Sequence, residues 1–118
     1  MLIIDYLTTI SNNFYHISYL LYLNMNQVEI EKKLSLLKNN WKLINNKIQI
    51  NIEFSNFDNA FNFMKEIAKE CELLNHHPLW TNEYNKLEVI LFTHDKGKIT
   101  DLDFKLARII DQKLIDLK

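Results

Sequence analysis

Hydrophobic and polar residues alternate with a period of two in the middle of the chain, which predicts a β-hairpin. Residues 48–54 show the clearest alternation and would bury one face of a strand. The apolar positions of that face are Ile48, Ile50, Ile52 and Phe54. Residues 41–44 predict the partner strand, and Asn45-Asn46-Lys47 predicts the turn because asparagine tolerates positive φ.

A period of 3.6 residues predicts helices on both sides of this hairpin. The first is expected to begin at Asn26, with Glu29 completing a capping box, and to end at Asn39-Asn40. The second, over residues 57–74, is capped by Ser55 and has the clearest apolar face of the chain. That face consists of Phe57, Ala60, Phe61, Met64, Ile67, Ala68 and Cys71. The opposite side is polar and is formed by Asn59, Asn62, Lys65, Glu66 and Lys69.

A second strand pair and a last helix complete the pattern. Strands are expected over residues 79–84 and 87–93, around Asn85-Lys86. Thr100 and Asp103 then cap a helix. Its expected buried stripe is Leu102, Leu106, Ile109, Leu114 and Leu117. The order α-β-β-α-β-β-α predicts an α+β fold, with a four-stranded antiparallel sheet and helices packed on one face.

Residues 1–24 differ in composition from the rest of the chain. They are rich in Ile, Leu and Tyr, contain Asp5 as their only acid, and lack Lys and Arg. Polar residues interrupt the apolar stretch, which argues against a signal peptide and a membrane span. We expect an N-terminal extension of uncertain order, or a start placed too early with Met25 as the alternative. Its apolar residues could form a helix that packs on the domain, expected at 25–118, or on a partner subunit.

Composition narrows the classes of function. The formal net charge of −1 gives no electrostatic reason to expect binding to nucleic acid or to a membrane. A single glycine argues against a glycine-rich phosphate loop. Cys71 is the only cysteine and is expected to be a small core residue. Without a disulfide within the chain, we expect a reducing compartment, the cytoplasm, with a nuclear location left open.

Adjacent histidines are the first candidates for chemistry. His76 and His77 precede Pro78, so the backbone there is expected to be extended. Neighbouring side chains on an extended backbone point to opposite sides, and both rings could hardly bind one metal ion. We therefore expect no metal. Glu72 lies four residues before His76 and would stack on it if the helix continued that far.

A third histidine is expected at the same edge of the sheet. His94 follows the predicted strand 87–93, and antiparallel pairing places the end of one strand beside the start of the next. Imidazoles on two sides of a pocket can donate and accept protons. Pro78 and Trp80 could line a flat pocket for a ring, or simply pack. From its local sequence, Asp103 is most simply a carboxylate that faces a helix dipole. For the histidines, the alternative interpretation is that they are structural groups held by hydrogen bonds.

These residues resemble the pterin-4a-carbinolamine dehydratase family, over about residues 26–115. The most specific stretch is Glu72-x-x-x-His76-His77-Pro78-x-Trp80, followed by Asn82, Tyr84-Asn85, Thr93-His94-Asp95 and Thr100-x-x-Asp103. Other matches are Trp41, Phe57-x-x-Ala60-Phe61-x-Phe63-Met64, Leu106-Ala107 and Ile110-Asp111. The sequence departs from the family at Asn75, where Asp is frequent, and at Asn40 and Lys98, where Gly is common.

The resemblance implies a fold like the one predicted and the activity of a 4a-hydroxytetrahydrobiopterin dehydratase, a hydro-lyase. Such an enzyme converts 4a-hydroxytetrahydropterin to quinonoid dihydropterin, which recycles the pterin cofactor of aromatic amino-acid hydroxylases, and it uses no cofactor. The resemblance assigns substrate binding and acid–base catalysis to His76, His77 and His94, with Glu72 and Asp103 in support. It leaves open which histidine is the acid and which the base.

The resemblance also implies partners and leaves two other functions open. A homodimer or homotetramer that binds a small-molecule pterin is expected, with no direct binding to nucleic acid and no membrane. One alternative is a non-catalytic dimerisation or coactivator module, which could present helix 57–74 to a protein. The other is action on a related pterin, such as one in molybdenum-cofactor metabolism.

Overall fold

The computed structural model describes residues 6–117, with side chains described for residues 14–18 and 26–117. The chain divides into two compact units, residues 1–32 and residues 33–118. Helix α1 (Tyr6–Ser35) continues through the position where a helix was expected to begin, so the predicted cap at Asn26 is wrong. Neither Gly nor Pro occurs before Pro78, so neither of these residues interrupts the helix. Within residues 6–117, none of the helices is both long and apolar enough to span a bilayer.

An antiparallel sheet with the order β1-β2-β4-β3 forms the base of the second unit. The strands are β1 (Lys42–Ile44), β2 (Lys47–Glu53), β3 (Leu79–Glu83) and β4 (Lys86–Leu91). Asn45 and Asn46 both have positive φ and make the turn of the first hairpin, as expected, but Lys47, which was predicted to belong to the turn, is the first residue of β2 and pairs with Ile44. The second turn lies at Tyr84-Asn85, one residue earlier than predicted, because Glu83 pairs with Lys86.

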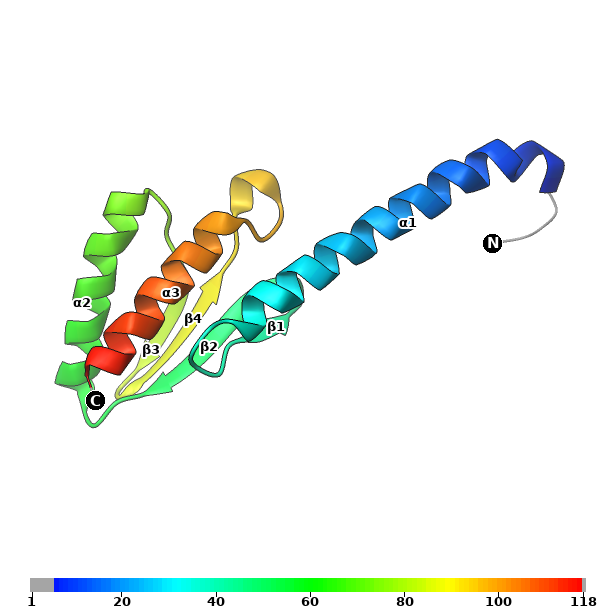
Figure 1. Cartoon of the computed structure of the whole chain (residues 1–118). Coiled ribbons are helices and arrows are strands. Elements are labelled where there is room, and N and C mark those ends of the chain that lie inside the picture. Colours follow the sequence, from blue (N-terminus) through cyan, green and yellow to red (C-terminus); the bar gives the residue numbers. More distant parts are fainter. Residues whose placement is uncertain (1–5, 118) are drawn as a thin grey trace. The chain divides into compact units, whose positions relative to one another are not determined.

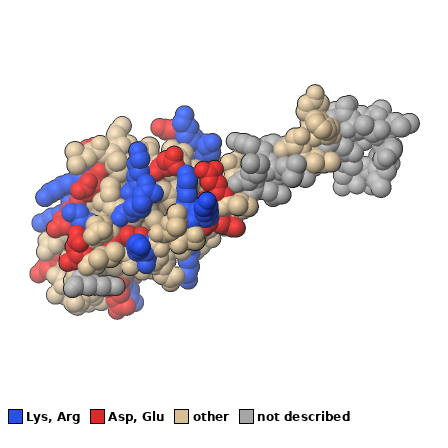
Figure 2. Space-filling model, viewed as in Figure 1, with Lys and Arg blue, Asp and Glu red and all other residues tan. Residues whose placement is uncertain are grey.

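Helices α2 (Phe57–Leu74) and α3 (Asp101–Asp116) cover one face of this sheet (Figure 1). The α+β fold expected from the sequence is thereby confirmed. The sheet contributes Ile48, Ile50, Leu87, Val89 and Leu91 to the core, and each is at most 3% exposed. The helices add Ala60, Phe63, Ile67, Cys71, Phe104, Leu106, Ala107 and Ile110. Figure 2 shows basic and acidic side chains interspersed over the visible face of residues 33–117, in line with the small net charge.

The buried face of α2 is rotated from the predicted one. Phe57 and Phe61 are 45% and 44% exposed and stack on each other, whereas Phe63 is buried. The helix is capped by Asn56, whose side chain accepts a hydrogen bond from the backbone of Asn59, and not by Ser55. The apolar pattern alone did not distinguish which phenylalanines face the sheet.

The buried face of α3 is also different from the predicted stripe. Of the predicted leucines and isoleucine only Leu106 is buried, and Leu117 is 62% exposed. Asp103 and Asp111 are buried instead, at 0% and 3% exposure. Buried carboxylates are tolerated when several donors reach them, and hydropathy assigns such residues to the surface.

Cys71 packs in the core, as predicted, with 1% of its surface exposed. Burial raises the pKa of its thiol from 9.0 to about 11. We expect iodoacetamide to label the folded protein about 100-fold more slowly than the urea-unfolded chain at pH 8, through the thiolate fraction alone. Equal rates, measured by mass spectrometry, would contradict the buried position. The folded state holds the thiol proton more tightly than the unfolded state does. The contribution of the protonated Cys71 thiol to stability is therefore complete below about pH 9 and is lost as the pH rises towards 11.

Candidate active site

A left-handed residue at the end of α2 turns His76 into the core. Asn75 has φ 50°, and its backbone N–H reaches the carbonyls of Cys71 and Glu72. The N–H of His76 then donates to the Cys71 carbonyl over 3.0 Å. Asparagine adopts this conformation more readily than most residues, which gives the departure at position 75 a structural role. His76 is 8% exposed and lies 2.6 Å, Nε2 to Oδ1, from the fully buried carboxylate of Asp103.

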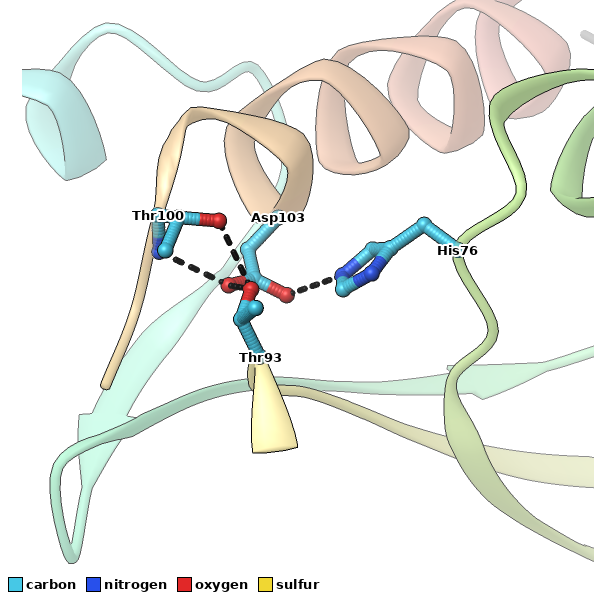
Figure 3. A network of polar contacts seen from close by, with 4 residues as sticks. All are labelled: His76, Thr93, Thr100 and Asp103. Atoms are coloured by element: carbon cyan, nitrogen blue, oxygen red, sulfur yellow. Dashed lines mark hydrogen bonds and ion pairs between the residues drawn. The ribbon is translucent and has the colours of Figure 1, made fainter. Parts of the chain in front are cut away.

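Two threonines hold the other oxygen of Asp103 (Figure 3). Oδ2 accepts the Thr93 hydroxyl over 2.7 Å and the backbone N–H of Thr100 over 2.9 Å. The two hydroxyls lie 2.7 Å apart, and because Thr93 donates to Asp103, its oxygen can accept from Thr100. The predicted capping box of α3 is confirmed, and its Asp103 also contacts His76.

This network fixes the tautomer of His76. An ionised Asp103 can only accept hydrogen bonds, so the hydrogen between the two side chains belongs to Nε2 of the imidazole. In the neutral ring Nδ1 then carries the lone pair, and it is the atom through which His76 can take up a proton. The arrangement is the familiar one of a carboxylate that orients a histidine, here inside the core.

His77 has a different and more exposed partner. Its Nε2 lies 3.0 Å from Oε1 of Glu72, with the two side chains 55% and 79% exposed. The expected stacking of Glu72 on His76 is therefore wrong, because α2 ends at Leu74 before the spacing reaches His76. The two adjacent histidines have separate environments, one buried and one in water, as the extended backbone predicted.

His94 lies directly after Thr93 and begins a short 3-10 helix, His94–Lys96. Its ring is exposed and meets the ring of Phe92 edge-on, with centroids 5.4 Å apart. In the sheet Leu79 pairs with Ile90, so the start of β3 lies beside the end of β4, as predicted. Asp103 bonds both His76 and the residue before His94, which connects the two parts of the site. Among the described side chains, no hydrogen bond joins His94 to either of the other histidines directly.

The remaining predicted residues lie on or next to β3. Trp80 is partly buried and pairs with Val89, whose side chain faces the helices, so both lie on the helix-covered face. Pro78 is partly buried just before the strand. The contact of Thr93 with Asp103 was not predicted, because this bond forms across a turn that leaves no periodic signal. Across side chains 14–18 and 26–117, no three His, Cys, Asp or Glu groups are placed to share a metal ion.

Comparison with known proteins identifies the family. The family model described as "Pterin 4 alpha carbinolamine dehydratase" matches residues 24–113. A protein of Prochlorococcus marinus subsp. pastoris, provisionally named a pterin-4-alpha-carbinolamine dehydratase, is 46% identical over 80 residues, or 68% of this chain and 83% of that protein. A protein of Christiangramia forsetii with the same provisional name is 41% identical over 87 residues, or 74% of this chain and 89% of its own.

A solved structure agrees with this match. The crystal structure of a transcriptional coactivator/pterin dehydratase from Brucella melitensis superposes with a TM-score of 0.69 and 36% identity. The similarity covers 72% of this chain and 92% of the Brucella chain. His76, His77 and His94 all lie inside residues 24–113, the part that the family model matches. The chain therefore belongs to the pterin 4 alpha carbinolamine dehydratase family.

Proposed function

We propose that this protein dehydrates a 4a-hydroxytetrahydropterin to the quinonoid dihydropterin by histidine acid–base catalysis. An acid protonates the 4a-hydroxyl, the carbon–oxygen bond breaks and water leaves. A base removes the proton of the neighbouring ring N–H, and a carbon–nitrogen double bond forms. Atoms and charge balance, and no electrons enter or leave the substrate, so two positioned proton carriers are sufficient.

The His76–Asp103 pair is the observation that carries this proposal. Its short, buried contact holds one imidazole in a single tautomer, while His77 and His94 remain exposed and free to exchange protons with water. The reaction donates one proton and accepts another. It is suited by one histidine that is held in place, His76, and by two that regain or release their protons to solvent, His77 and His94. Glu72 supports His77, and Pro78 and Trp80 are proposed to contact the pterin ring.

Alanine at His76, His77 or His94 is expected to lower the dehydration rate by roughly 10²–10⁴ for each group that transfers a proton. The assay follows enzymatically generated 4a-hydroxytetrahydropterin in a stopped-flow spectrometer, with the uncatalysed rate subtracted. His16→Ala is the control, because His16 lies on α1 in the other unit of the chain. Full activity in the triple variant of the candidate histidines would refute the proposal. A parallel assay with pterins of other side chains tests whether a related pterin is the physiological substrate.

A coactivator role is the second candidate, and exposed aromatic rings on α2 favour it. Phe57 and Phe61 stack with centroids 5.7 Å apart, and Lys65 lies over the ring of Phe61. The exposed side of α2 was predicted to be polar. The two phenylalanine rings instead add a small apolar patch to the exposed surface of the helix, which a protein partner can cover. Two results together would favour the coactivator over the enzyme. The protein would capture a partner in stoichiometric amount, and a Phe57→Ser, Phe61→Ser variant would lose that capture, while no pterin turnover is detected.

We further propose that the protein forms a homodimer or homotetramer and is located in the cytoplasm.

A further inference from the structure

Helix α1 has a heptad seam that the pterin reaction does not use. Positions 7, 10, 14, 17, 21, 24 and 28 follow one another at alternating spacings of three and four residues. They are Leu7, Ile10, Phe14, Ile17, Leu21, Asn24 and Val28, so every position but one is apolar. Seams of this kind, kept over three heptads, are typical of helices that supercoil around each other.

The described members of this seam are exposed in the single chain. Phe14, Ile17 and Val28 have 69%, 56% and 62% of their surface accessible. All three lie in residues 1–32, which form a compact unit of their own, and residues before 24 lie outside the family match. Apolar side chains aligned along one stripe of a helix gain free energy when a second helix removes that stripe from water.

We propose that residues 7–28 pair with the same residues of a second copy of this chain, as a parallel coiled coil. Asn24 points to this occupant. A polar residue in an apolar seam is best matched by an identical residue at the same level, and only a parallel pair in register brings two copies of Asn24 together.

The charge pattern also favours a second copy over a different helix. Residues 6–28 contain no Asp, Glu, Lys or Arg, so two identical helices do not repel each other. Partner choice between different coiled-coil helices is usually set by charges that flank the seam. Residues 6–28 have no charged side chains with which to select a helix of a different protein, whereas the seam is complementary to a second copy of itself.

Cysteine cross-linking of the full chain tests the pairing with a matched control. Phe14→Cys places a thiol in the seam, and Tyr15→Cys places one on the neighbouring residue outside it, which is equally exposed at 72%. The native Cys71 is buried, so it does not compete for the cross-link. Under mild oxidation we expect Phe14→Cys to form several-fold more disulfide-linked dimer than Tyr15→Cys.

A second substitution separates helix pairing from association through the rest of the protein. Ile17→Asp, introduced into the Phe14→Cys variant, puts a charge into the seam one turn away and is expected to reduce the cross-linked fraction to the Tyr15→Cys level. Absence of the disulfide, equal yields from the two cysteine variants, or a yield unaffected by Ile17→Asp would each overturn the proposal. Dehydratase activity is a separate measurement, so failure here does not bear on the proposed reaction.

Discussion

Asp103→Asn is expected to reduce dehydratase activity by on the order of 10²–10⁴ while the protein stays folded. Asp103 accepts from His76, from Thr93 and from the backbone of Thr100. Two of these donors bind Oδ2 and would retain the amide oxygen there. The amide nitrogen would then face His76 and donate to Nε2, which forces the imidazole hydrogen onto Nδ1. The ring would keep its place but lose the lone pair at Nδ1, the atom through which His76 can take up a proton.

The tautomer itself can be measured, which distinguishes this positioning role from a general loss of stability. Nitrogen-15 NMR of the histidine rings should show Nε2–H in the wild type and Nδ1–H in the variant. Circular dichroism and urea unfolding report whether the fold is kept.

Asp101→Asn is the matched control for this substitution. Asp101 lies in the same first turn of α3, is exposed, and hydrogen-bonds Lys33, which lowers the pKa of its carboxyl. Removing its charge should leave the rate within a factor of about two, in line with the small effects of surface substitutions. Equal losses of dehydratase activity in both variants would show that negative charge near the start of α3 is what matters. The contact between Asp103 and His76 would then not be the cause. Full activity of Asp103→Asn would remove Asp103 from the mechanism.

The parts of the fold that a local pattern encodes were predictable from the sequence. Alternation located β2, two asparagines located the first turn, and the Thr100-x-x-Asp103 spacing located the start of α3. Each of these signals acts between residues only a few positions apart. The family resemblance then supplied the three candidate histidines.

Contacts between distant segments were not predictable in the same way. Asp103 and His76 are separated by 27 positions, and the bond depends on how α3 lies against the end of α2. Local reading explained Asp103 as a helix cap, which is correct but incomplete. The pairing of Glu72 was predicted wrongly because it depends on the left-handed conformation of Asn75, a single residue that decides which histidine faces inward.

The second buried carboxylate of α3 shows the same limit and gives the largest expected effect on stability. Asp111 is 3% exposed and accepts hydrogen bonds from the backbone of Lys38, from the Asn39 amide and from the Trp41 indole. The donor distances are 2.6, 2.7 and 2.7 Å, and they join α3 to the segment that leads into β1. In residues 33–117 no Lys or Arg forms an ion pair with it, so these donors alone compensate for its burial.

Asp111→Ala is expected to lower the free energy of unfolding by about 3–5 kcal/mol, because it leaves the buried Trp41 indole and two part-buried donors without their acceptor. Urea unfolding at a fixed protein concentration measures this loss. Trp41→Phe removes one donor and leaves a small cavity where the rest of the buried indole lay, so about 2–3 kcal/mol is expected. Asp116→Ala, at the exposed end of the same helix, should change stability by no more than about 0.5 kcal/mol. If Asp111→Ala proved as mild as Asp116→Ala, the segment before β1 would be held by its apolar contacts alone, and the carboxylate would have no structural role.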